Sequence, residues 1–276
     1  WGEVKNYSDT KQRVDDLFFE YARILEGLQP KVFVAENVRG LVRGKSKGYF
    51  KEILGALKDC DYKVRAKVLD AQWLGVPQRR QRLIFVGVRE DLGLDPVYPD
   101  PLPYRYTIKD ALPWVRRAVH DTGGEFSYGD FTNEQCPTVA VADPGNGPLG
   151  PYHYQIDAPP IEEDAWIGEY AIGDEWEKLK QGEQSEKYFS LIKPDPNQPC
   201  PTVTQTGKTT GAASVTHPTE KRKFSIAELK RIQGFPDDFD LSGDRAERWE
   251  RLARTVPPVM MKHIAATIRD EILEQI

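Results

Sequence analysis

Two kinds of segment are missing from this 276-residue sequence, and each absence removes a class of protein. No stretch of about 18 apolar residues occurs, so no membrane-spanning helix is predicted. The first residues, Trp1 to Arg13, are polar and mixed in charge, unlike the apolar centre of a secretory signal peptide. We therefore expect a cytoplasmic protein with no membrane partner.

Cysteine is scarce as well. The three cysteines, Cys60, Cys136 and Cys200, are far apart, odd in number and without C-x-x-C spacing. This pattern argues against a zinc site or a disulfide framework and favours a reducing compartment. No metal site is predicted.

The chain does have enough apolar material for a sizeable core. Hydrophobic residues make up 39% of the sequence, and its length allows one large domain or two small ones. The net charge of −5 does not favour nucleic acid, although a local basic cleft matters more than the total.

Apolar periodicity in the first third predicts an α/β fold. Helical spacing covers 11–28 and 49–57, while 31–35, 62–68 and 82–88 have the pattern of strands. Strands and helices in this order, with apolar strands, predict a parallel sheet from the later part of a doubly wound fold.

The texture changes from about residue 91 to 219, where prolines and glycines are dense. Cys136-Pro-Thr-Val139 is echoed there by Cys200-Pro-Thr-Val203, which favours a second, strand-rich and irregular domain. Helix signals return at Ser225, whose spacing to Glu228 is that of a capping box.

Two further helices are predicted over 244–254 and from Pro257-Pro258 to the end, because proline suits the first turn of a helix.

Three segments carry candidate chemistry. Glu36 and Asn37 follow a buried strand, where ligands bind in open α/β sheets. In Gly75-Val-Pro-Gln-Arg-Arg-Gln-Arg82, Arg80 and Arg82 share a strand face and form a clamp for phosphate or a base edge. Hydroxyls, glycines and Lys208 in 201–211 suit a phosphodiester backbone. Taken singly, such segments are more often a solvated strand end, a charge run or a flexible turn.

Together, in order and spacing, the segments resemble the bacterial DNA cytosine-C5 methyltransferases. Glu36-Asn-Val38 is similar to the family's ENV motif, and 75–82 to its Q-x-R-x-R motif. Residues 222–238 resemble its motif IX, and Val256-Pro-Pro258 resembles its last motif. The resemblance implies a partial doubly wound, Rossmann-like methyltransferase sheet with a smaller strand-rich target-recognition domain.

The resemblance also implies three parts of the chain. Residues 1–91 would be the C-terminal part of the catalytic α/β domain, and 92–219 the target-recognition domain. Residues 220–276 would hold the motif IX helix and the C-terminal helices, the last packing back on the catalytic domain.

The implied reaction transfers a methyl group from S-adenosylmethionine to C5 of a cytosine flipped out of duplex DNA. Glu36 would act at N3 of the base, beside Asn37, while Arg82 would hold O2 and orient the glutamate. Arg80 would support the catalytic loop or the phosphates.

The remaining site residues follow from the same motifs. The implied DNA contacts are Thr202, Gln205, Lys208 and Arg222. The implied cofactor contacts are Thr255 and Val256. Ala253-Arg254-Thr255 stands where the family has Gly-Asn-Ala or Gly-Asn-Ser, so an asparagine contact to the cofactor is missing.

Other family features are absent from the sequence. It has neither the glycine-rich cofactor segment nor the Pro-Cys motif of the nucleophile, and it begins at Trp1. We therefore expect a C-terminal portion with an incomplete cofactor pocket that is inactive alone. The alternatives are a subunit of a split enzyme, whose partner chain carries the N-terminal motifs, or a non-catalytic DNA-binding protein. Double-stranded DNA is the expected partner of this bacterial, archaeal or phage-encoded protein, which would act either in a restriction–modification system or as an orphan methyltransferase.

Overall fold

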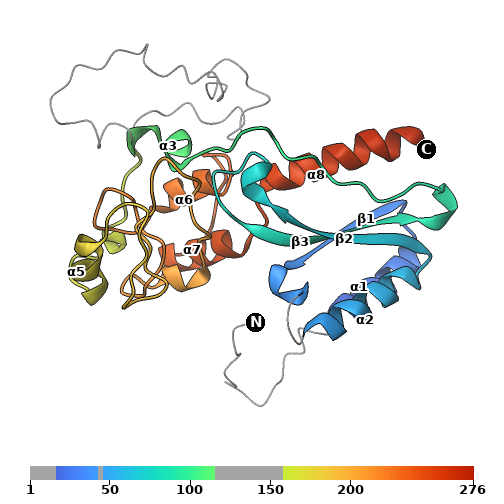
Figure 1. The fold of residues 1–276 in the computed structure, drawn as a ribbon, viewed down its shortest axis with the longest axis horizontal. Coiled ribbons are helices and arrows are strands. Elements are labelled where there is room, and N and C mark those ends of the chain that lie inside the picture. Colours follow the sequence, from blue (N-terminus) through green and yellow to red (C-terminus); the bar gives the residue numbers. More distant parts are fainter. Residues whose placement is uncertain (1–16, 43–45, 116–157) are drawn as a thin grey trace, which may run out of the picture. The chain divides into compact units, whose positions relative to one another are not determined.

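The computed structural model describes residues 17–42, 46–115 and 158–276 (Figure 1). The chain divides into two compact units. Unit 1 consists of Trp1–Leu69, Gln81–Pro99 and Ile264–Ile276. Unit 2 consists of Asp70–Arg80 and Asp100–His263.

Unit 1 is an α/β unit built on a three-stranded sheet with the order β1-β3-β2, which confirms the predicted fold class. Its strands are β1 (Val32–Val38), β2 (Tyr62–Asp70) and β3 (Gln81–Arg89). Its helices are α1 (Leu17–Leu28), α2 (Lys47–Lys58) and the C-terminal part of α8 (Pro258–Glu271). Short 3-10 turns are η2 (Arg39–Val42), η5 (Glu90–Leu92) and η9 (Leu273–Gln275).

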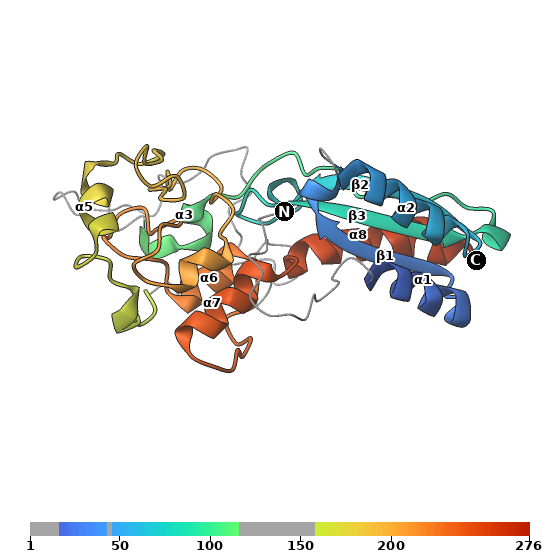
Figure 2. The same cartoon turned by 90° about the horizontal axis from the view of Figure 1, so that it is seen from below.

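The pairing of β1 with β3 is antiparallel, so the prediction of a parallel sheet is wrong for these two strands. The register runs from Val32 opposite Val88 to Val38 opposite Arg82. A continuous apolar run shows only that both faces of a strand are covered, and it does not fix the strand's direction. Helices α1 and α2 lie side by side on one face of the sheet, and the C-terminal part of α8 lies on the other (Figures 1 and 2).

The core of unit 1 lies between the sheet and the pair α1 and α2. Leu25, Ile53 and Leu57 from the helices pack with Leu83 and Phe85 of β3. The opposite face of β3 carries three further fully buried side chains. These are Ile84, Val86 and Val88.

Unit 2 has short helices joined by irregular chain. Its helices are α3 (Ile108–Ala111), α5 (Ala171–Lys178), α6 (Ile226–Ile232), α7 (Arg245–Arg254) and the first turns of α8, and its 3-10 turns are η4 (Ala71–Trp73), η7 (Glu163–Ala165) and η8 (Gln205–Lys208). In the described part of unit 2, strand pairing is limited to isolated bridges, such as those of Ile192 with Gln184 and Val215. The described part of unit 2 is therefore not strand-rich as predicted. Its frequent prolines lack the N–H donors that a strand ladder needs. The segment Cys136–Val139 lies outside the described residues.

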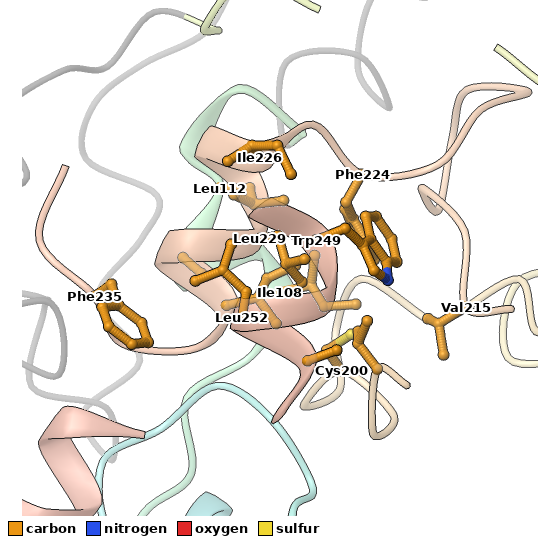
Figure 3. Packing of buried hydrophobic residues seen from close by; sticks show 14 of the residues in the cluster. Ile108, Leu112, Cys200, Val215, Phe224, Ile226, Leu229, Phe235, Trp249 and Leu252 are labelled. Atoms are coloured by element: carbon orange, nitrogen blue, oxygen red, sulfur yellow. The ribbon is translucent and has the colours of Figure 1, made fainter. Parts of the chain in front are cut away.

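The largest hydrophobic core of unit 2 surrounds α6 and α7. Phe224, Leu229, Trp249 and Leu252 pack there with Cys200 from the preceding irregular chain (Figure 3). The predicted capping box is confirmed, since the hydroxyl of Ser225 accepts from the Glu228 N–H and the Glu228 carboxylate accepts from the Ser225 N–H. Helix α7 begins with a second capping box, formed by Asp244 and Glu247.

Within the described ranges, no helix has the length and apolar character that crossing a membrane requires. The same ranges contain no cluster of three or more histidine, cysteine or acidic side chains that could hold a metal ion.

Gly87 lets β1 and β3 pack closely around one aromatic ring. It lies opposite Phe33, and a Cβ at residue 87 would be 2.0 Å from the Phe33 ring. Gly87→Ala should therefore lower the free energy of unfolding by about 1–3 kcal/mol, the usual penalty of overpacking. Urea unfolding monitored by circular dichroism measures the change.

Gly55→Ala in α2 is the matched control, because a Cβ there meets nothing within 4 Å. It should stabilise the helix by up to about 1 kcal/mol. If Gly87→Ala unfolded at the wild-type urea concentration, the close contact between ring and glycine would be contradicted.

Candidate functional site

The glutamate and one arginine singled out in the sequence form an ion pair in unit 1. Arg82 Nε lies 2.8 Å from Glu36 Oε1. Glu36 is near the end of β1, and Arg82 is the second residue of β3. Since the two strands run in opposite directions, the end of β1 lies beside the beginning of β3.

The strand register places both side chains on one face of the sheet. Glu36 is opposite Ile84, and Arg82 is two residues away from Ile84 on the same strand. Such diagonal neighbours lie within reach of long side chains. The Arg82 side chain is 12% exposed and that of Glu36 is 30% exposed, so the pair is partly buried but reachable.

The pair offers a cationic guanidinium and an anionic carboxylate to a polar ligand. Burial lowers the pKa of the Arg82 guanidinium, and the neighbouring Glu36 carboxylate opposes that shift. Asn37 fixes the local backbone, because its Oδ1 accepts from the Val38 N–H at 2.7 Å. Beyond it, Arg39 donates to the side chain of Gln81 at the start of β3.

Arg80 has a different environment, inside unit 2. Its side chain is fully buried and donates from Nη2 to the carbonyl oxygens of Ala253 and Thr255, at 2.6 and 2.7 Å. Its Nη1 reaches the Val203 carbonyl oxygen at 3.4 Å. Arg80 therefore ties the chain after Cys200 to the end of α7.

Three of the four predicted DNA contacts lie on one loop, residues 202–212, called here the 202–212 loop. Thr202, Gln205 and Lys208 are exposed, as are three further threonines of the loop. These are Thr204, Thr206 and Thr209. The Thr202 hydroxyl donates to the carbonyl oxygen of Arg79.

Buried side chains hold this loop from behind. The Trp249 indole N–H donates to the Thr204 carbonyl oxygen at 3.0 Å, and its ring packs directly against Gly207. The Lys223 ammonium is fully buried and donates to three carbonyl oxygens of the loop. Those acceptors belong to Gly207, Thr209 and Ala212. Burial lowers the pKa of Lys223 to about 7.

The polar side chains of the loop bond to α7. Lys208 Nζ lies 2.5 Å from Glu250 Oε2. Gln205 Oε1 accepts from Nε and Nη2 of Arg254, at 2.9 and 2.7 Å.

Arg222, the fourth predicted DNA contact, is buried within unit 2. Its guanidinium donates to Glu228 at 2.7 and 2.8 Å and to Glu220 at 3.0 and 3.2 Å. His217 lies beside this network with its Nε2 3.6 Å from Glu228, and burial lowers its pKa to about 4. Because two carboxylates occupy the guanidinium, a DNA contact by Arg222 stays a prediction and forms no part of the proposed function.

The two predicted cofactor residues follow α7. The Thr255 hydroxyl donates to the Leu252 carbonyl oxygen at 2.8 Å, and its own carbonyl oxygen accepts from Arg80. Val256 is partly exposed. Since the polar groups of Thr255 bond within unit 2, these two residues do not by themselves fit a cofactor.

Neither cysteine in the described ranges has the environment of a nucleophile. Cys60 is 7% exposed, and its thiol lies within hydrogen-bond distance of the carbonyl oxygens of Ala22 and Ala56. Cys200 is fully buried in the unit 2 core. Burial raises the pKa of both thiols, which disfavours the reactive thiolate.

Sequence analysis missed the side chains that hold the loop. Nothing in a basic pair such as Arg222-Lys223 indicates that both members are buried. The helical spacing of Trp249, Leu252 and Ala253 does indicate a buried face of α7, but it does not say what covers that face.

Comparison with known proteins gives a consistent family. The model of the C-5 cytosine-specific DNA methylases matches residues 1–270. The type II methyltransferase M.Sau96I of Staphylococcus aureus is 29% identical over 97% of this chain and 56% of its own length. M.PspPI of a Psychrobacter strain is 31% identical over 87% of this chain and 54% of its own. The chain thus spans just over half the length of these relatives.

Solved structures share the fold. A DNA modification methyltransferase encoded within an Escherichia coli prophage has a TM-score of 0.63 at 22% identity, over 94% of this chain and 74% of that one. The DNMT2 of Spodoptera frugiperda has a TM-score of 0.59 at 13% identity, over 97% and 77%. With the family model matched over almost the whole sequence, this chain belongs to the C-5 cytosine-specific DNA methylases, a family of methyltransferases.

Proposed function

We propose that this chain acts in the methylation of C5 of a flipped cytosine in duplex DNA. The observation that carries the proposal is the ion pair of Glu36 and Arg82 at adjoining strand ends, reachable from solvent. Family membership supports the same reading. The 202–212 loop would hold the DNA backbone through Thr202, Gln205 and Lys208.

The chemistry of the pair suits a cytosine ring. Activation of C5 places negative charge towards N3, where the carboxyl group of Glu36 would hold or deliver a proton. Arg82 would keep that carboxyl group oriented through Nε. A guanidinium has five N–H donors, so Arg82 retains donors for the O2 oxygen of the base.

S-adenosylmethionine would supply the methyl group when bound. Thr255 and Val256 would make at most a small part of its pocket, since the polar groups of Thr255 already bond within unit 2. A chain that carries the N-terminal motifs would supply the rest. Duplex DNA is the proposed partner, and the base must leave the stack before either Glu36 or Arg82 reaches it.

The 276-residue chain should not methylate DNA by itself. The reason is that Cys60 and Cys200 are buried with raised thiol pKa values. The Pro-Cys pair in the sequence, Pro199-Cys200, contains this buried cysteine and does not match the family's nucleophile motif. Transfer of tritiated methyl groups from S-adenosylmethionine to mixed-sequence duplex DNA measures this, with a no-protein reaction as the blank. Methyl transfer by the pure chain clearly above the blank would contradict the prediction that this chain lacks the nucleophile.

The same assay separates the alternatives. Activity restored by adding a chain with the glycine-rich and Pro-Cys motifs would support a split enzyme. Duplex binding without transfer in any such mixture would favour a non-catalytic DNA-binding protein.

In an active assembly that contains this chain, Glu36→Gln should lower turnover by about 10²–10⁴-fold, the usual contribution of general acid–base catalysis. The amide keeps the size and a hydrogen bond but supplies no proton, so the affinity for DNA should change much less. Single-turnover kinetics and DNA titration measure the two effects.

The control is Glu20→Gln, which neutralises the carboxylate of an exposed ion pair with Arg23 in α1. It should leave turnover at the wild-type value. A Glu36→Gln enzyme that turned over within a few-fold of wild type would remove Glu36 from its proposed role.

Arg80 is proposed as a positioning residue, since it ties Val203 to the end of α7. Arg80→Met keeps the aliphatic stem but leaves buried carbonyl oxygens without this donor. The free energy of unfolding should fall by about 3 kcal/mol or more. Urea unfolding followed by tryptophan fluorescence measures the loss.

Arg79→Met is the neighbouring control, because Arg79 is exposed. It should change stability by less than about 0.5 kcal/mol. An equal fall in the free energy of unfolding for both variants would show that the buried hydrogen bonds of Arg80 do not account for the loss of stability.

A further inference from the structure

Four side chains of unit 2 form a charged cluster between η8 and α7. Its members, called here the Glu250 cluster, are Gln205, Lys208, Glu250 and Arg254. Glu250 lies at the centre, with Lys208 Nζ 2.5 Å from Oε2 and Arg254 Nη2 2.5 Å from Oε1. The side-chain oxygen of Gln205 accepts two further hydrogen bonds, from Nε and Nη2 of Arg254.

One carboxylate therefore holds two cations, each on a different oxygen. A phosphodiester group also presents two anionic oxygens on one central atom, and it accepts the same donors. The Glu250 carboxylate thus occupies the position that such a group would take between Lys208 and Arg254. With two cations and one anion, the three charged members carry a net charge of +1, and they carry +2 without Glu250.

The cluster is open to solvent and easy to rearrange. The side chains of Lys208, Glu250 and Arg254 are 44%, 23% and 65% exposed. Ion pairs this exposed contribute little to stability, because water competes for both partners. The hydrogen bond from Lys208 lowers the pKa of Glu250, so the carboxylate is charged at neutral pH.

The backbone beneath the cluster is fixed. Trp249 and Lys223 hold the carbonyl oxygens of Thr204 and Gly207 from inside the unit. The exposed hydroxyls of Thr204 and Thr206 lie next to the cluster in the sequence and are 2.8 Å apart. A ligand would therefore meet donors on a rigid turn, which limits the ordering that binding requires.

We propose that the Glu250 cluster is a phosphodiester-binding site in which DNA displaces the Glu250 carboxylate from Lys208 and Arg254. Arg254 is then a DNA contact, and Glu250 is an internal competitor that weakens non-specific binding. This site rests on the proposed function, because it assumes that the 202–212 loop faces nucleic acid. A purely structural cluster would make the opposite prediction, since removing Glu250 would then loosen the turn.

The test is the affinity of the full chain for a fluorescent duplex, measured by anisotropy as a function of salt concentration. Glu250→Gln keeps the shape and one acceptor but removes the competing charge. It should bind on the order of tenfold more tightly at low salt. Arg254→Gln should bind more weakly, with a salt slope smaller by about one unit. A variant with both Glu250→Gln and Arg254→Gln should lose the increase in affinity that Glu250→Gln alone produces.

Glu177→Gln is the matched control, because Glu177 pairs with Lys221 in another exposed ion pair of unit 2. It changes the net charge by the same amount and should leave the affinity within about twofold of wild type. An equal gain from Glu177→Gln and Glu250→Gln would overturn the site, because net charge alone would then explain it. Weaker binding by Glu250→Gln would also overturn it, in favour of a structural role.

Single-stranded DNA of the same sequence separates this site from the proposed function. Tighter binding of both probes by Glu250→Gln, without any wild-type preference for the duplex, would support the phosphate site and count against the proposed function. Wild-type duplex binding that neither Glu250→Gln nor Arg254→Gln alters would keep the proposed function and overturn the site. Absence of DNA binding by every variant would overturn both.

Discussion

The antiparallel register of β1 and β3 is the constraint on which the candidate chemistry depends. Glu36 and Arg82 are 46 positions apart in the numbering, and only the meeting of one strand's end with the other's beginning brings them to 2.8 Å. If the two strands were parallel, the beginning of β3 with Arg82 would lie beside the beginning of β1, away from Glu36. Both side chains project from hydrogen-bonded strands, so the ladder holds them in place more rigidly than a loop would.

Unit 2 is held together in part by hydrogen bonds from buried cations to backbone carbonyl oxygens. In its described part it has no strand ladder, so many backbone carbonyl oxygens need partners from elsewhere, and an unpaired buried carbonyl is costly. Two buried cations supply those partners. Arg80 binds carbonyl oxygens next to the end of α7, and Lys223 binds three from the 202–212 loop. The exposed hydroxyls of the loop are therefore held in place by charges that never reach the surface.

Much of this organisation could be predicted from the sequence. Apolar periodicity predicted α2 and β3 nearly to their ends, and Ser225 with Glu228 predicted the beginning of α6 through a capping box. The strand direction could not be predicted, because burial on both faces produces the same apolar run in either direction. Nor could the burial of Arg222 and Lys223 be predicted. A capping box does not show that its glutamate, Glu228, also pairs with Arg222, and the carbonyl oxygens that accept from Lys223 lie in irregular chain.

The arginines of one short motif show how far such a pattern can be interpreted. Arg79, Arg80 and Arg82 are close neighbours in the sequence, yet one is exposed, one is fully buried and one is paired with Glu36. Arg80 and Arg82 were predicted to share a strand face, but β3 begins only at Gln81, so the period of two does not extend to Arg80. A strand boundary between two arginines thus separates a structural cation from a candidate catalytic one. The difference follows from the oxygen atoms around each guanidinium, because the side chains themselves are chemically identical. Backbone carbonyl oxygens surround Arg80, whereas the Glu36 carboxylate lies beside Arg82.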